Sequence, residues 1–151
     1  MALISDKDRE AIQKHFEEQL ESNVQITMFT ERSSPIIIPG KEVCETCDQT
    51  QELLEEVAAT SDKIALDVHE IGESREKAAE LGIDRVPAFV VSGAGKGRVR
   101  FFGIPSGYEF SAFIEDLVDV SRGSTDLSAD TRGYIQSLNQ DVNIKVFTTP
   151  T

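Results

Sequence analysis

The chain has 151 residues, and 15 Lys and Arg against 27 Asp and Glu give it a net charge of −12. Such a charge argues against nucleic acid or an anionic membrane as the main partner, because both are polyanions. Hydrophobic residues make up 39% of the chain and 10 glycines add to the apolar share, which is typical of a globular protein. At this length we expect one domain with a core large enough to fold without disulfides.

The sequence carries no membrane or secretion signal. No apolar run approaches the ~18 residues that a membrane-spanning helix needs. The N-terminal sequence MALISDKDRE reaches a charged residue at Asp6, where a secretory signal peptide would have its apolar core. We therefore expect a cytoplasmic protein that does not bind membranes.

Apolar periodicity and turn residues predict helices and strands in alternation. Ile12, Phe16 and Leu20 follow at helical spacing behind a cap at Ser5, whereas the β-branched residues of 24–30 are typical of a strand. The predicted series comprises helices over 6–21, 44–59 and 72–81, strands over 24–30, 64–68, 86–91 and 98–102, and a helix with a capping box at Ser106 and Glu109 that ends near Ser121.

This order of elements predicts an α/β fold. We expect the early strands, which are separated by helices, to pair in parallel, and the last two strands, joined by the glycine-rich break at 93–97, to form an antiparallel hairpin. We therefore expect a mixed central sheet flanked by helices on both faces, with an additional N-terminal helix, in a first unit over residues 1–122.

The C-terminal segment predicts a second, incomplete unit over residues 123–151. A helix over 128–138 precedes a strand over 142–148, which matches residues 24–30 in four of seven positions at an offset of 118. A lone strand leaves backbone groups unpaired. We expect it either to dock on the first sheet or to pair with another chain, as a homodimer through 128–148.

The two cysteines carry the chemical signal of the sequence. Thiol–disulfide exchange needs one accessible thiolate to attack a disulfide and a second thiol close by to resolve the product. Cys44 and Cys47 are three residues apart at the start of a predicted helix, where the helix dipole favours a thiolate at Cys44. This spacing indicates a redox pair.

Two other roles for the pair stay open. Two cysteines at this spacing form half of a tetrahedral metal site, but His15 and His69 are 54 residues apart and are not spaced as further ligands. A metal would need a site shared across a dimer, and we expect none. Alternatively, both thiols are buried and inert. We place neither histidine in catalysis, with His69 in a polar loop.

Pro87 opens an otherwise apolar strand. A proline at the first residue of a strand is usually trans and marks an edge or a strand start. A cis Pro87 would instead present the backbone of Val86 for β-type pairing with an extended substrate beside Cys44. The residues alone leave both geometries open, with trans the more common.

The order of these motifs resembles the thioredoxin fold. More narrowly, the chain resembles the N-terminal unit of the glutaredoxin-like protein disulfide oxidoreductases, a family that joins two thioredoxin-fold units with a Cys-x-x-Cys in each. The similar segments are residues 3–6, 44–48, 83–88, 102–105 and 113–122, and 146–151 is similar to the lead-in to the second motif.

The resemblance implies a protein disulfide oxidoreductase in which Cys44 attacks, Cys47 resolves and Pro87 is cis. It also implies protein disulfides or dithiols as substrates, the Cys44–Cys47 disulfide in place of a bound cofactor, and a flavoprotein reductase as electron donor. Two departures are a loop over 31–43 that is longer than the family's and a second cysteine pair, generally the main site of the family, that is missing here. The alternative is therefore a redox-inactive support module.

Acidic residues surround the first cysteine. Glu42, Glu45 and Asp48 lie close to Cys44 in the sequence, and only Lys41 is a nearby cation. Like charge disfavours a thiolate and so destabilises the reduced form. We expect a reduction potential toward the reducing end of the range of thioredoxin folds.

Overall fold

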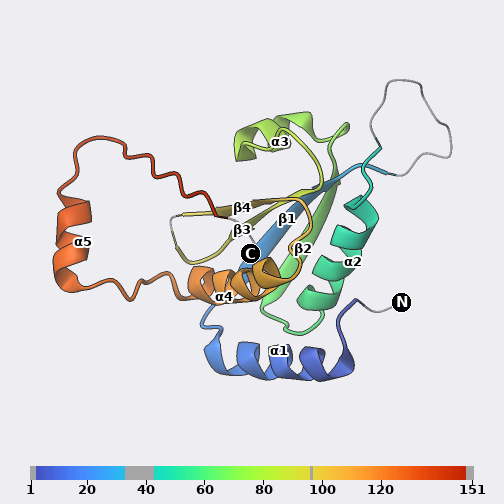
Figure 1. Cartoon of the computed structure of the whole chain (residues 1–151), viewed down its shortest axis with the longest axis horizontal. Helices are drawn as coiled ribbons and strands as arrows, with labels where there is room; N and C mark the ends of the chain where they lie inside the picture. The colour runs from blue at the N-terminus through green and yellow to red at the C-terminus, as the bar shows by residue number, and fades with distance from the viewer. Residues whose placement is uncertain (1–2, 33–42, 96, 149–151) are drawn as a thin grey trace.

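Four strands form one mixed sheet in the computed structural model of the chain (Figure 1). The structure describes residues 3–32, 43–95 and 97–148. The strand order is β2-β1-β3-β4, with β2 parallel to β1 and β3 antiparallel to both of its neighbours. The strands are β1 (Val24–Thr30), β2 (Ile64–Glu70), β3 (Ala88–Ser92) and β4 (Val99–Phe102). The parallel pair and the antiparallel hairpin are as predicted.

Helices cover both faces of this sheet (Figure 1). One face is covered by α2, which packs on β1 and β2, and by α4, which packs on β1 and β3; α3 lies on the other face. An outer layer is formed by α1, which packs on α4. The helices are α1 (Asp6–Gln19), α2 (Cys47–Ala58), α3 (Arg75–Leu81), α4 (Tyr108–Arg122) and α5 (Ala129–Gln136). The predicted α/β class is confirmed.

The alternating side chains of β1 and β3 contribute to two separate cores. Ile26 and Met28 from β1 and Phe89 from β3 lie in the larger core with α1, α2 and α4. Phe29 and Val90 lie in the smaller core with α3. Successive strand residues point to opposite faces of a sheet, so a strand that is apolar on both faces must be covered twice. This places β1 at the centre of the fold.

The starts of α2, α3 and α4 differ from the prediction, and α3 begins at Arg75 rather than at Gly72. α2 begins at Cys47 rather than at Cys44, because a turn precedes its first helical residue. α4 has Gly107 as its N-cap, with a positive φ of 59°, and no side chain caps it. The predicted capping box of Ser106 and Glu109 is therefore wrong. The chain enters the helix through a backbone turn at Gly107, which leaves Ser106 one residue too early to be the N-cap.

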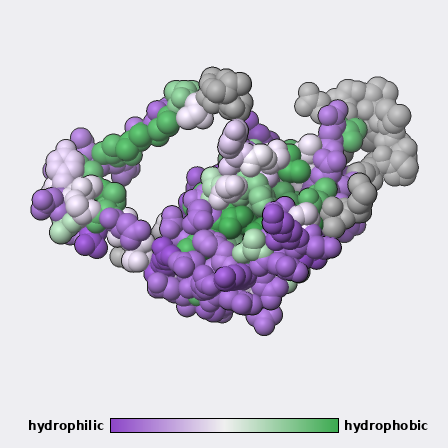
Figure 2. Space-filling model, turned by 60° about the horizontal axis from the view of Figure 1, so that its bottom comes forward, coloured by the Kyte–Doolittle hydropathy of each residue, from purple (hydrophilic) through white to green (hydrophobic). Residues whose placement is uncertain are grey.

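The C-terminal segment stands apart from the body of the molecule. Every residue from 123 to 148 is exposed. α5 forms within the predicted range 128–138, but the predicted strand over 142–148 does not form. A strand needs hydrogen bonds to a neighbouring strand, and this segment arches away from the packed part of the chain (Figure 2). The assignment of 123–151 to a second unit stays a prediction.

Most of the loop over 31–43, including Lys41 and Glu42, lies outside the described residues.

Within the described ranges, no helix is long and apolar enough to cross a membrane.

The carboxylate of Glu56 ties the start of the chain to α2. Glu56 Oε1 accepts a hydrogen bond from Leu3 N at 2.7 Å, and Oε2 accepts from Ile4 N at 3.0 Å and from Arg9 Nη2 at 3.1 Å. The side chain is 13% exposed. Its burial alone would raise the pKa of Glu56, but the two amide hydrogen bonds and the Arg9 charge outweigh burial and lower that pKa. The carboxylate is therefore favoured in the folded chain.

We expect Glu56→Gln to lower the free energy of unfolding by about 1–3 kcal/mol at pH 7, because hydrogen bonds to a charged acceptor are lost. The folded-state pKa of Glu56 lies below its ordinary value of 4.5. The contribution of the carboxylate is therefore complete above about pH 4.5 and is lost as the pH falls through the lower folded-state pKa.

Urea unfolding of the wild type and Glu56→Gln at pH 7 and at about pH 3 measures this effect. The difference between the two proteins should shrink at the acid pH. Glu55→Gln, at an exposed neighbour, is the control and should change stability little. A difference that stays constant with pH would contradict the assignment.

Candidate active site

The two cysteines lie where the chain passes from β1 into α2. Cys44 Sγ and Cys47 Sγ are joined by a disulfide of 2.03 Å, and their Cα atoms are 5.5 Å apart. Cys47 is the first residue of α2, and Cys44 lies just before the turn that precedes the helix. The predicted pair is therefore at a helix N-terminus, and the structure describes its oxidised state.

The two cysteines differ in exposure. Cys47 is 0% exposed, whereas Cys44 is half-buried. Cys44 is therefore the only one of the two cysteines with exposed surface. This difference suits a pair in which one thiol attacks and the other resolves the product. It argues against a pair that is buried and inert as a whole.

Pro87 lies beside the end of β1, from which the chain leads to the cysteines. β3 begins at Ala88, and Ala88 pairs with Phe29, one residue before β1 ends at Thr30. The Val86–Pro87 peptide bond is cis. This is the geometry that the resemblance implies, and not the trans geometry that is commoner for proline. Both residues precede β3, which begins two residues later than predicted.

The backbones of Pro87 and Val86 differ in their hydrogen bonding. Pro87 O accepts a hydrogen bond from Gly103 N at 2.8 Å, which ties the proline to the loop after β4. Within the part of the chain that is described, the N–H and C=O of Val86 form no hydrogen bond with another backbone group. An open donor and acceptor are what β-type pairing with a peptide needs.

Gly103 is a site residue that the sequence did not single out. Its φ of +96° lies in a region where glycine alone is unstrained. The only signal was a glycine directly after a predicted strand. Its hydrogen-bond partner, Pro87, could not be identified without the tertiary structure.

Arg85 and Phe102 form a second feature that the sequence did not single out. Arg85 Nε donates to Asp84 Oδ1 at 2.9 Å and Arg85 Nη2 to Asp84 Oδ2 at 3.2 Å, and this hydrogen bonding lowers the pKa of the Asp84 carboxyl. Arg85 Cζ lies 5.4 Å from the centroid of the Phe102 ring, which is 47% exposed. Arg85, which precedes Val86 in the sequence, thus exposes a cation, and Phe102, the last residue of β4, exposes an aromatic ring beside it.

The histidines belong to other parts of the fold. His15 Nε2 lies 3.1 Å from Glu115 Oε1, between α1 and α4. His69 is in β2 rather than in the predicted polar loop, with Nε2 2.8 Å from Lys77 Nζ and its ring centroid 5.6 Å from that of Phe29. Among the residues described, no group of three or more His, Cys, Asp or Glu side chains is placed to hold a metal ion.

Carboxylates lie close to the cysteines in the described chain. Glu45 and Asp48 are both exposed, and Asp48 is in the first turn of α2. A negative charge at this end of a helix opposes the stabilisation of the Cys44 thiolate by the helix dipole. The predicted reducing potential therefore stays a prediction that charge reversal can test.

We expect Glu45→Lys to raise the reduction potential of the pair by on the order of 10–20 mV. A cation should stabilise the thiolate, and hence the reduced form, by about 0.5–1 kcal/mol, and about 30 mV corresponds to 1.4 kcal/mol. Titration against glutathione buffers measures the potential. Glu55→Lys makes the same change of charge later in α2 and should have little effect. Equal shifts in the two variants would refute the electrostatic explanation.

Comparison with known families identifies the fold and the motif. The family model described as a thioredoxin domain matches residues 36–115, just over half of the chain and including both cysteines. The chain therefore belongs to the thioredoxin-domain family. Its Cys44–Cys47 disulfide is the Cys-x-x-Cys motif of this family in the oxidised state.

Individual relatives agree with this assignment. The F subunit of alkyl hydroperoxide reductase from Xanthomonas campestris pv. phaseoli is 26% identical over 126 residues, which cover 82% of this chain and 22% of the relative. A protein disulfide oxidoreductase from Aeropyrum pernix superposes with a TM-score of 0.71 at 25% identity, over 89% of this chain and 55% of the other.

The F subunit of the alkyl hydroperoxide reductase from Enterococcus faecalis has the same fold, with a TM-score of 0.73 at 23% identity over 89% of this chain and 61% of the other. The chain thus spans about a fifth of the curated relative and somewhat over half of these solved chains. It matches the N-terminal, thioredoxin-like part of such proteins.

Proposed function

We propose that the chain is a thiol–disulfide oxidoreductase that acts on protein disulfides and dithiols through Cys44 and Cys47. The observation that carries this proposal is the pairing of a half-buried Cys44 with a fully buried Cys47 at the start of α2. The arrangement leaves one sulfur open to a substrate and keeps the other within bonding distance of the first.

The exchange proceeds in two displacements. In the reduced chain the Cys44 thiolate attacks one sulfur of a substrate disulfide, so that a mixed disulfide forms and the other substrate sulfur leaves as a thiolate. Cys47, as a thiolate, then attacks Cys44 Sγ. The Cys44–Cys47 disulfide forms and the second substrate thiol is released. Two electrons pass from the cysteine pair to the substrate, and the reverse sequence oxidises a dithiol.

The substrate peptide would pair with the open backbone of Val86. Its N–H and C=O lie next to Pro87, at the end of the sheet from which the chain leads to the cysteine turn. Pairing of this kind holds an extended backbone without regard to its side chains, so it suits many protein substrates. We assign Val86 and Pro87 to substrate binding on this basis.

A cycle of disulfide reduction needs a source of electrons. We propose that the cysteine pair acts without a further bound cofactor and that a flavoprotein reductase re-reduces it. This partner is implied by the family resemblance, and one relative of the chain is itself named as part of a reductase. We also propose that the protein acts in the cytoplasm.

The alternative function is a redox-inactive or weakly active support module of a two-unit oxidoreductase. The exposed segment 123–148 favours it, because a second thioredoxin-fold unit would begin there. Under this alternative the Cys44–Cys47 pair forms a disulfide but does not turn over protein substrates.

An insulin reduction assay with dithiothreitol separates the two functions. We expect thiol-dependent turnover by the wild type that falls at least about 100-fold in Cys44→Ser, because that variant has no attacking thiolate. Cys47→Ser should instead trap mixed disulfides that are visible on a non-reducing gel. Wild-type turnover no faster than that of Cys44→Ser would favour the support module.

The exposed segment 128–148 is also a candidate contact between two copies of the chain. It carries apolar side chains with nothing packed over them: Tyr134 is 70% exposed, Ile144 81% and Phe147 91%. Sedimentation equilibrium over a range of concentrations tests this. A homodimer should dissociate when residues 139–151 are removed, and a wild type that stays monomeric at high concentration would rule it out.

A further inference from the structure

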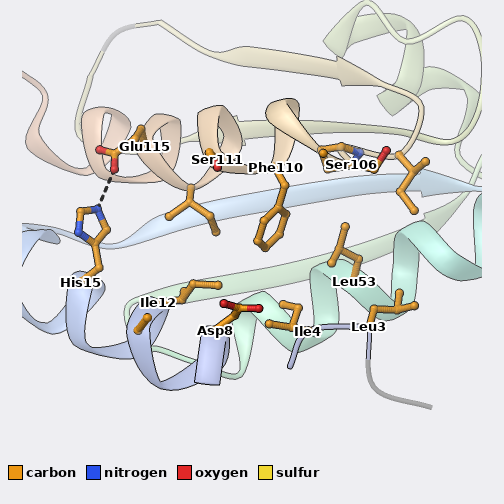
Figure 3. A pocket seen from close by; sticks show the side chains of 15 residues that line it. Leu3, Ile4, Asp8, Ile12, His15, Leu53, Ser106, Phe110, Ser111 and Glu115 are labelled. Atoms are coloured by element: carbon orange, nitrogen blue, oxygen red, sulfur yellow. Dashed lines mark ion pairs between the residues drawn. The ribbon is translucent and has the colours of Figure 1, made fainter. Parts of the chain in front are cut away.

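A groove with a volume of about 700 Å³ lies between α1 and α4 (Figure 3). Side chains from α1, α2 and α4 point into it (Figure 3). Figure 2 brings this side of the molecule forward and shows apolar side chains gathered within a largely hydrophilic surface. An apolar groove with a polar rim is typical of a binding surface. Its apolar walls include Ile4, Ile12, Leu53, Ile104, Phe110 and Ile114.

The rim of the groove is acidic. Asp8 from α1 and Glu115 from α4 both line it, and Glu115 is 63% exposed. His15 from α1 also lines the groove, with Nε2 3.1 Å from Glu115 Oε1. In a chain with a net charge of −12, this rim attracts cations and repels anions. The groove therefore suits an occupant that combines apolar side chains with positive charge.

The groove is connected to the cysteine site through the loop after β4. Gly103 N donates to Pro87 O at 2.8 Å. The two residues that follow, Ile104 and Pro105, line the groove. The loop that holds Pro87 is thus bonded to the loop that forms one end of the groove.

α2 provides a second connection. Cys47 is the first residue of α2, and Leu53, which lines the groove, lies six residues further on. Six helical residues correspond to roughly 9 Å along the helix axis. An extended peptide covers that distance in about three residues. A peptide that runs from the cysteines along α2 would therefore reach the level of Leu53 within a few residues.

On the basis of the thiol–disulfide exchange proposed above, we propose that the α1–α4 groove is a second contact site for the protein substrate, which takes an extended segment with apolar and basic side chains near the attacked disulfide. The apolar side chains of such segments are buried in folded proteins and exposed in unfolded ones. The groove would thus direct the enzyme to unfolded or partly folded chains whose disulfides are still accessible.

Binding and exchange are measured separately, on the full chain. The probes are two disulfide peptides of equal charge, one with a Val-Lys-Val-Lys-Val extension and one with Ser-Lys-Ser-Lys-Ser, together with fluorescent forms in which Ser replaces Cys. Fluorescence anisotropy with the oxidised chain reports binding. Single-turnover exchange with the reduced chain reports kcat/KM for each disulfide peptide.

Ser111→Trp is the test variant, because Ser111 is exposed on the groove wall and a large ring there fills the groove without removing a core side chain. Ala112→Trp is the matched control, at the next residue of α4, which is also exposed and does not line the groove. We expect the wild type and Ala112→Trp to prefer the Val peptide in both measurements. Ser111→Trp should reduce this preference about 10-fold.

Several results would overturn the proposal for the groove. They can be distinguished from results that would overturn the proposed thiol–disulfide exchange. Equal binding and equal kcat/KM for the two peptides in the wild type, or equal effects of Ser111→Trp and Ala112→Trp, would remove the groove but leave the exchange reaction in place. Absence of exchange with either peptide would remove the proposed function together with the groove's role in it. A wild-type dimer that Ser111→Trp alone dissociates would assign the groove to a second copy.

Glu115→Lys is a second variant, used if Ser111→Trp unfolds at a lower temperature than the wild type. Glu115 is exposed at the rim, so the substitution reverses a rim charge without changing the apolar walls. It should weaken binding of the basic Val peptide about 3–10-fold at low salt, and the difference from wild type should shrink as salt is added. Unchanged binding at low salt would overturn the charge part of the proposal.

Discussion

The antiparallel pairing of β1 with β3 is the contact on which the candidate site depends. The cysteine turn follows β1, and Pro87 immediately precedes β3. Pairing of Phe29 with Ala88 brings these two segments to the same end of the sheet, although about 40 residues separate Cys44 from Pro87 in the chain. Because β1 is buried on both faces, this register is strongly constrained, and the position of Pro87 is constrained with it.

Burial and negative charge determine which groups can approach the candidate site around this contact. Burial separates the two cysteines into one that is partly exposed and one that is not. Acidic residues near Cys44 and at the rim of the α1–α4 groove act in the same direction, since both disfavour negative charge nearby. In the proposed function the acidic residues near Cys44 lower the reduction potential of the cysteine pair, and the acidic rim of the groove selects a basic peptide.

Local patterns predicted most of the elements, and the errors have one local and one tertiary cause. The helical spacing of Ile12 and Phe16 and the β-branched run of 24–30 predicted elements that the structure confirms. Ser106 had the residue type of an N-cap, but the backbone turn at Gly107 decided where the helix starts. The pattern of 142–148 is that of a strand, yet a strand forms only where a neighbour supplies its hydrogen bonds.

By itself, the sequence determined the α/β order of elements, the acidic charge and a cysteine pair at the start of a helix, because each depends on residue type and spacing along the chain. The packed structure was needed to show that Cys44 is more exposed than Cys47 and that Pro87 O accepts a hydrogen bond from Gly103 N. It also formed a groove from α1, α2 and α4. Exposure, hydrogen bonds between distant residues and cavities arise from the packing of segments that are far apart in the sequence, so no local pattern encodes them.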